Sequence, residues 1–214
     1  MTEDVPPRLA GHPDRIRWNA KYAGGAGPAF VPHPLAARAL ALAPPDGPVL
    51  DLACGPSGAA LLAAGQGRRV TAVDVSDTAL GLLDAEARRR GVRGLLTLVH
   101  ADLGEWAADG PGGFALVLCT GFWDRPVFGP AARAAGPGGV LAWEAFTIAA
   151  RTVRPGLPAG WCLAPGEPAS LLPPGFTVLG EEDVPDERHG AKRRLLARRA
   201  GHGGHDRNGE HGPA

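Results

Sequence analysis

Two short apolar segments, joined by a loop with two glycines and a helix-forming stretch, constrain the fold of this chain most. Residues 49–58 read Val-Leu-Asp-Leu-Ala-Cys-Gly-Pro-Ser-Gly, and residues 70–74 read Val-Thr-Ala-Val-Asp. Each apolar run is typical of a buried strand that ends where small or acidic residues begin. Glycines let a ligand approach the backbone, and an acid about 20 residues later accepts hydrogen bonds from a ribose. The pattern therefore predicts a βαβ nucleotide-binding unit.

The acid at position 51 indicates which nucleotide such a unit would bind. In a dinucleotide site this loop faces a pyrophosphate, which the carboxylate of Asp51 would repel unless it turned away. S-adenosylmethionine instead carries a sulfonium and an ammonium, so a neighbouring acid is favourable. Asp51 therefore favours a methyltransferase over a nicotinamide-dependent enzyme.

Composition limits the partners that we expect. The 214 residues suffice for one domain, and the 22 basic and 22 acidic side chains cancel. A neutral chain lacks the charge expected of a protein that binds nucleic acid or an anionic membrane, so we expect a small-molecule partner. The three cysteines are widely spaced and odd in number, which predicts reduced thiols, no metal site and a cytoplasmic protein. No leader or membrane-spanning stretch is expected either.

Alternating apolar runs and helix-forming segments predict the architecture. The expected strands are residues 49–53, 69–73, 95–99, 114–119, 140–146, 176–179 and 194–198, and the expected main helices are residues 34–42, 58–64, 77–90 and 126–135. We predict an α/β fold, a doubly wound and mostly parallel seven-stranded sheet with helices on both faces and a terminal antiparallel pair. Residues 1–33 are expected to be an N-terminal arm, residues 34–200 the domain, and residues 201–214 a disordered Gly/His-rich tail.

Several motifs in chain order support a family resemblance. They are Asp51 to Gly55, Val70 to Asp74, Ala101 to Leu103, Leu116 to Thr120 and Gly138 to Phe146. This series resembles the class I S-adenosylmethionine-dependent methyltransferases. Trp18 to Tyr22, Trp143 to Thr147, Gly166-Glu167 and Glu181 to Val184 resemble most closely the tellurite-resistance (TehB-like) small-molecule methyltransferases. The resemblance spans about residues 15–200 and implies a Rossmann-like fold whose last strand is antiparallel.

The resemblance also implies roles for individual residues, each just past the carboxyl end of a strand. Asp51, Ala53 and Gly55 would face the methionine moiety of S-adenosylmethionine, Asp74 the ribose and Val75 the adenine, and Cys54 would also bind the cofactor. The remaining cofactor residues would be Asp102 and Leu103 at the adenine edge and Cys119 and Thr120 at the cofactor floor. The acceptor pocket would include Trp123, Trp143 and Glu144, and His189 would bind or deprotonate the acceptor.

The glycine loop departs from the family pattern and keeps alternatives open. The family usually has Gly-x-Gly-x-Gly where this chain has Ala53, Gly55 and Ser57, and Ser57 matters if its position needs a positive φ. In another register the loop resembles a dinucleotide motif, although Pro56 removes one N–H that a pyrophosphate would use. We expect direct methyl transfer to a small-molecule nucleophile, with an NAD-dependent oxidoreductase and a non-catalytic binding module as the alternatives.

Overall fold

The computed structural model describes residues 5–24, 27–42, 46–108, 113–185 and 190–201. Its helices are α1 (Pro7–Ala10), α2 (Pro13–Ala23), α3 (Pro34–Ala41), α4 (Gly58–Gly65), α5 (Asp77–Arg89) and α6 (Arg125–Ala134). Its strands are β1 (Val49–Leu52), β2 (Val70–Asp74), β3 (Leu96–His100), β4 (Phe114–Thr120), β5 (Ala135–Thr147), β6 (Cys162–Leu163), β7 (Phe176–Val184) and β8 (Lys192–Arg199). Short 3-10 helices lie at Arg93–Leu95, Ile148–Thr152, Ala159–Trp161 and Ala169–Leu171.

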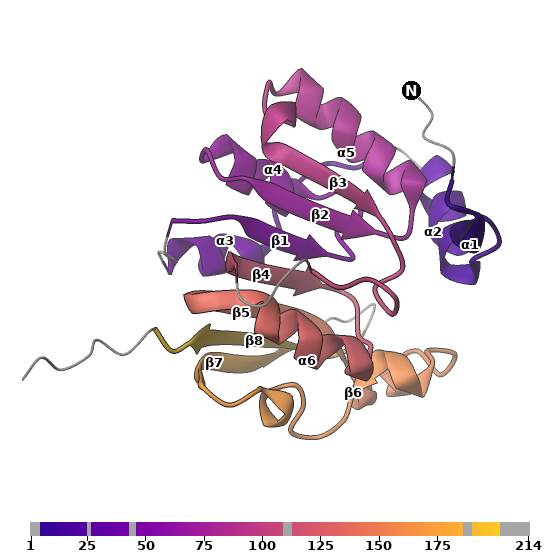
Figure 1. Ribbon diagram of the computed structural model, residues 1–214. Coiled ribbons are helices and arrows are strands. Elements are labelled where there is room, and N and C mark those ends of the chain that lie inside the picture. The colour runs from indigo at the N-terminus through magenta and orange to yellow at the C-terminus, as the bar shows by residue number, and fades with distance from the viewer. Residues whose placement is uncertain (1–4, 25–26, 43–45, 109–112, 186–189, 202–214) are drawn as a thin grey trace, which may run out of the picture.

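In the described part of the chain, the strands form one eight-stranded sheet, ordered β3-β2-β1-β4-β5-β8-β7 with β6 paired to β5 (Figure 1). β1 to β5 are parallel, whereas β8 runs antiparallel to both β5 and β7. The order reverses at β1, because β2 lies on one side of it and β4 on the other. Ligands of doubly wound sheets bind outside the carboxyl ends of the strands at such a reversal.

The predicted architecture is confirmed, with one strand more than the sequence indicated. β6 has two residues, too few for a recognisable pattern, and exists because Cys162 and Leu163 pair with Phe146 and Thr147 of β5. The predicted main helices and the antiparallel pair are present with small shifts in their bounds. β5 begins at Ala135, and β7 extends to Val184.

Helices cover both faces of the sheet. Leu35 of α3, Leu61 of α4 and Leu83 of α5 pack with β-strand residues in one apolar cluster. Phe128 of α6 packs with Leu50 and Trp143 in a cluster on the other face. Since side chains alternate along a strand, neighbours such as Leu50 and Asp51 face opposite helix layers.

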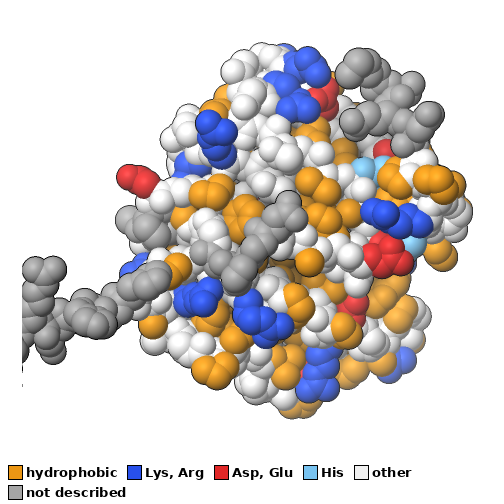
Figure 2. Space-filling view, viewed as in Figure 1, with side chains coloured by type: hydrophobic (Ala, Val, Ile, Leu, Met, Phe, Trp, Pro, Cys, Tyr) orange, Lys and Arg blue, Asp and Glu red, His pale blue; other side chains and the backbone are white. Residues whose placement is uncertain are grey.

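The surface bears mixed charge on the face shown in Figure 2. Lys and Arg side chains are spread between hydrophobic and neutral ones there and do not merge into one basic area. None of the helices in the described residues has both the length and the hydrophobicity needed to cross a bilayer.

Candidate cofactor and acceptor site

Asp51 is a buried acid in the centre of the sheet's carboxyl edge. Its side chain points to the α3–α5 face, the residue is 2% exposed, and Ser57 Oγ donates a hydrogen bond to its Oδ2 at 2.6 Å. Burial raises the pKa of Asp51 to about 7, with a smaller contribution from the charge of Asp74 and opposition from the Ser57 hydrogen bond. A cation placed beside this carboxyl group would favour its ionised form.

The loop after β1 has a positive φ at two of the three positions where the family usually has glycine. Ala53 has φ 47° and Gly55 has φ 57°, whereas Ser57 has φ −74° and caps α4 by accepting from the Ala60 N–H at 2.9 Å. The serine in place of the third glycine is therefore unstrained and useful, because it caps a helix and bonds Asp51. The strain falls on Ala53, since a left-handed φ costs a residue with a Cβ atom about 1–2 kcal/mol.

Asp74, at the end of β2, joins the two loops that face the carboxyl edge. Its Oδ2 accepts from the Gly55 N–H and its Oδ1 from the Ser76 N–H, both at 2.7 Å. Burial raises the pKa of Asp74, while the hydrogen bonds from Ser76 and Gly55 oppose that rise. Each carboxylate oxygen keeps a lone pair that could accept from a further hydroxyl. The next residue, Val75, directs its carbonyl oxygen to His100 Nε2 at 3.0 Å.

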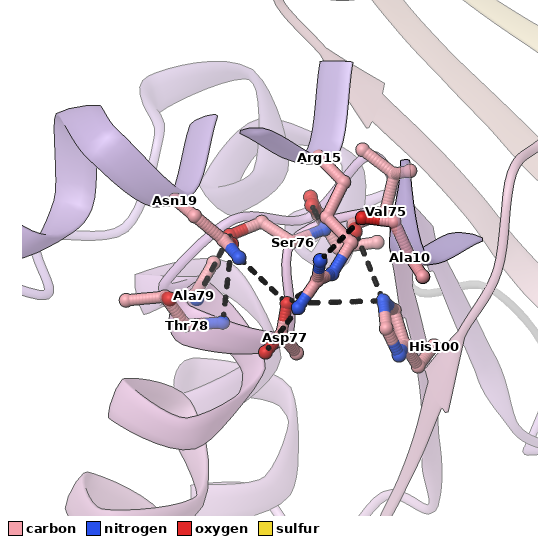
Figure 3. A network of polar contacts seen from close by, with 10 residues as sticks. Ala10, Arg15, Asn19, Val75, Ser76, Asp77, Thr78, Ala79 and His100 are labelled. Carbon is pink, nitrogen blue, oxygen red and sulfur yellow. Dashed lines mark hydrogen bonds and ion pairs between the residues drawn. The ribbon is translucent and has the colours of Figure 1, made fainter. Parts of the chain in front are cut away.

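Helix α2 docks on the start of α5, where Arg15 and Asn19 face Ser76 and Asp77 (Figure 3). Arg15 forms a two-point ion pair with Asp77, with nitrogen–oxygen distances of 2.7 and 3.2 Å. Asn19 donates to Asp77 Oδ1 at 2.7 Å and accepts from the Ser76 hydroxyl at 2.6 Å. The amide of Thr78 also donates to Asn19, at 3.3 Å. These contacts join residues nearly 60 positions apart, so sequence patterns could not reveal them.

Tyr22, at the end of α2, is a site residue that sequence reasoning missed. A Cβ atom added to Gly55 would lie 2.8 Å from the Tyr22 hydroxyl, so the phenol packs directly over the glycine of the loop. Burial and the nearby charge of Asp74 raise the pKa of Tyr22 to about 12. The group therefore remains a neutral O–H donor at physiological pH. The only available signal was its place in the Trp18–Tyr22 motif.

Asp102 lies near the same edge, after β3. Its Oδ1 accepts from the Gly104 N–H at 3.0 Å, and its Oδ2 is 3.5 Å from His12 Nε2, in the turn before α2. Leu103 instead packs in the cluster on the α6 face. The N-terminal residues thus contact both the Asp74 loop and the Asp102 loop.

The two cysteines of the predicted cofactor site differ in exposure. Cys119, near the end of β4, is fully buried with its Sγ 3.8 Å from the carbonyl oxygen of Phe122. Cys54 is partly exposed in the loop after β1, and its amide donates to Val73. Burial raises the pKa of both thiols well above the usual value, so both remain protonated. Thr120, the last residue of β4, is partly exposed beside them.

The predicted acceptor residues lie on opposite faces of the sheet. Trp123 and Trp143 are 4% and 0% exposed, pack edge to face on the α6 side, and Trp143 Nε1 donates to the carbonyl of Phe122. Neither presents a surface to a ligand, so we do not carry them into the proposed site. Glu144 faces the same side as Asp51, where His33, Lys192 and Arg194 contact it.

The sequence also predicted a role for His189 and no metal site. His189 lies outside the described residues, so its role stays a prediction. Within the described residues, no group of three or more His, Cys, Asp or Glu side chains is placed to hold a metal ion. A cavity of about 570 Å³ lies between α6 and residues 103–108, but Leu50 and Leu52 line it. It is therefore on the face opposite Asp51 and is not the site described above.

Comparisons with known proteins agree with this geometry. Residues 49–139 match the family model described as a methyltransferase domain, and that span contains both loops joined by Asp74. This segment of the chain is therefore similar to a methyltransferase domain. No curated protein sequence matches the chain.

Solved structures of methyltransferases share the fold of this chain at low sequence identity. TehB from Haemophilus influenzae has a TM-score of 0.65 and 16% identity, with 85% of this chain and 67% of TehB covered. Magnesium protoporphyrin IX methyltransferase (ChlM) from Synechocystis PCC 6803, with bound SAH, has a TM-score of 0.61 and 17% identity, with 78% and 80% covered. A putative sarcosine dimethylglycine methyltransferase from Galdieria sulphuraria has a TM-score of 0.66 and 14% identity, with 87% and 98% covered.

S-adenosylmethionine is the expected cofactor, and the residues at the site fit it. Two buried carboxyl groups, Asp51 and Asp74, flank a loop of small residues and suit a ligand that carries cationic and hydroxyl groups. Gly55 and the neutral Tyr22 hydroxyl complete that surface.

Proposed function

We propose that this protein transfers the methyl group of S-adenosylmethionine to a nucleophilic atom of a small molecule by direct displacement. The cofactor supplies a methyl group on a good leaving group, so the protein mainly has to bind, orient and exclude water. ChlM is named for methylation of magnesium protoporphyrin IX, and this similarity in fold supports a small-molecule acceptor here.

The observation that carries the proposal is the burial of Asp51. A carboxyl group that is 2% exposed and hydrogen-bonded to Ser57 is costly to keep unless it meets a partner. A ligand with an ammonium and a sulfonium would provide that partner, and a pyrophosphate would not. The Gly55 N–H, which a dinucleotide site would direct at phosphate, already donates to Asp74.

The other residues have roles in holding the cofactor. Asp74 would accept hydrogen bonds from the ribose hydroxyls while it holds the Gly55 loop in place. Tyr22 would donate from its hydroxyl at the methionine end, with Ala53, Cys54 and Gly55 as the backbone surface beneath it. Val75 and Asp102 stay assigned to the adenine end and Thr120 to the floor. Leu103 and Cys119, which are 7% and 0% exposed, would contribute main-chain atoms there.

Methyl transfer does not always require the protein to move a proton. A general base is required only when the acceptor atom is protonated at the working pH. His189 remains our candidate for that step.

Calorimetric titration with S-adenosylmethionine tests the first half of the proposal. We expect saturable binding to the wild-type protein, weaker binding to Asp51→Asn, and unchanged binding to Asp84→Asn, an acid on α5 paired with Arg88. Absence of saturable binding, together with equal behaviour of the two variants, would refute it.

Methyl turnover tests the second half and separates the alternatives. Release of S-adenosylhomocysteine with any member of a panel of hydroxyl, thiol and amine acceptors would exclude a non-catalytic binding module. That alternative draws support from Ala53, since a methyl group stands where the family usually has glycine. Stabilisation by NAD but not by S-adenosylmethionine in a thermal-shift assay would instead favour the oxidoreductase.

A further inference from the structure

Glu144 of β5 is the centre of a buried ionic cluster that the cofactor does not need. Its side chain is 1% exposed, with Arg194 Nε 2.6 Å from Oε2 and Lys192 Nζ 3.2 Å from Oε1. His33 Nε2 is 3.3 Å from the same Oε1. Although burial opposes ionisation, hydrogen bonds from His33 and Arg194 lower the pKa of Glu144 to about 2. Glu144 is therefore an anion at physiological pH.

The charges of this cluster do not cancel. His33 Nδ1 accepts from the Leu35 N–H at 3.2 Å, so it carries no proton, and the proton of a neutral ring lies on Nε2, directed at Glu144. One carboxylate faces the two cations Lys192 and Arg194, which leaves one positive charge in excess.

A second cation contacts the same aromatic ring as Lys192. The Lys192 ammonium and the Arg154 guanidinium are 5.2 and 5.1 Å from the centroid of the same ring, that of Phe146. Within the described part of the chain, Arg154 makes no ion pair with a carboxylate. The Phe146 ring, Lys192 and Arg154 thus form a small surface with a net positive charge.

This surface lies at the carboxyl edge, on the face that Asp51 also points to. In the sheet, Asp51 of β1 pairs with Leu118 of β4, which in turn pairs with Ala142 of β5. Glu144 lies two residues beyond Ala142 along β5 and therefore faces the same side of the sheet. With strands about 4.8 Å apart and a rise of about 3.3 Å per residue, the Cα atoms of Asp51 and Glu144 are about 12 Å apart. Lys192, paired with Phe146, lies further toward the same edge. A methyl group held near Asp51 and an acceptor of about one ring would bridge this distance.

We propose that Lys192 and Arg154 bind an anionic group of the methyl acceptor, a carboxylate or a phosphate, and that Glu144 positions the Lys192 ammonium for this contact. The inference rests on the proposed function and adds the chemical class of the substrate. Lys192 has three N–H donors, of which Glu144 takes one, and its side chain is 25% exposed. Because the whole chain is neutral, the selection of anions is local to this cluster.

Binding of paired probes to the protein saturated with S-adenosylhomocysteine tests this inference. The probes are benzoate, phenyl phosphate and the neutral benzamide, and dissociation constants are measured by ligand-observed NMR titration. We expect at least one anion to bind about tenfold more tightly than benzamide. The two anions distinguish a carboxylate site from a phosphate site.

Variants of β8 show whether Lys192 carries the effect. Lys192→Met should weaken anion binding about tenfold and leave the affinity for S-adenosylhomocysteine unchanged, and Lys192→Arg should retain most of it. Arg193→Met is the matched control, because Arg193 is the next residue and pairs with Asp183 instead. It removes the same charge and should not alter anion binding.

The outcomes separate this inference from the proposed function. Equal binding of benzamide and both anions, no anion binding to the cofactor-loaded protein, or equal effects of Lys192→Met and Arg193→Met would overturn the anion site while the function stands. Failure of S-adenosylhomocysteine itself to bind would refute the proposed function and this inference with it.

Discussion

Replacement of Asp51 by asparagine should make the free protein more stable and cofactor binding weaker. Asparagine keeps the volume of the side chain and an oxygen that accepts from Ser57. It removes a carboxyl group whose pKa is raised from 3.8 to about 7 by burial. The Asp51 carboxyl group therefore lowers the stability of the free protein and raises its affinity for a cationic ligand.

The sign and size of the stability effect follow from that shift. A carboxyl group with a raised pKa in the folded state contributes its full stability only below pH 3.8, and loses it as the pH rises to about 7. Since one pKa unit is worth about 1.4 kcal/mol, the loss above pH 7 is on the order of 4 kcal/mol. Urea unfolding should show Asp51→Asn to be more stable than the wild type by up to that amount at pH 7.5, and by little at pH 4.

The affinity for S-adenosylmethionine should change in the opposite direction. If the ionised form of Asp51 binds the cofactor, affinity of the wild type rises about eightfold between pH 6 and pH 7.5, because the ionised fraction rises by that factor. Asp51→Asn is the control, because asparagine does not ionise and any remaining pH dependence of its affinity comes from the ligand. Titration calorimetry of this variant should show weaker binding with little dependence on pH. Equal stability of the two proteins at pH 7.5, together with a wild-type affinity independent of pH, would refute the reasoning.

Three further substitutions test the loop and the docked helix. Ala53→Gly should raise the free energy of unfolding in urea by about 1 kcal/mol, since the relief of the left-handed φ exceeds the extra entropy of glycine in the unfolded chain; a decrease would contradict the strain. Asn19→Ala removes hydrogen bonds to Ser76 and Asp77, so hydrogen exchange of residues 13–23 should accelerate several-fold and cofactor affinity should fall; unchanged exchange would show that these bonds do not hold α2. Tyr22→Phe should weaken cofactor binding by about tenfold to a hundredfold in calorimetry, the value of one hydrogen bond to a charged group, without lowering the thermal midpoint of the free protein; an equal affinity would remove Tyr22 from the site.

Local patterns predicted much of the sheet and the placement of its two acids. The strands around Asp51 and Asp74 are short apolar runs ended by turn residues, and parallel strands bring their carboxyl ends to one edge. The resemblance to class I methyltransferases added the order of the motifs. The sequence did not predict β6, because a two-residue strand forms only through its pairing with β5.

In the loop after β1, the backbone conformation decides which residue of the glycine pattern is strained. Sequence alone left open which residue would require a positive φ. The structure places it at Ala53, while Ser57 adopts an extended conformation that caps α4 and bonds Asp51. The departure at Ser57 therefore has a structural use, and the strain lies where the first glycine would stand.

The sequence by itself determined the strand and helix pattern and the positions of Asp51 and Asp74, because strands and turns depend on neighbours along the chain. Only the tertiary structure decided that Trp143 lies in the core and Glu144 at the opposite face, since adjacent strand residues differ by which helix layer covers them. It alone brought Tyr22 over the loop, because that contact depends on how α2 docks against residues distant in the chain.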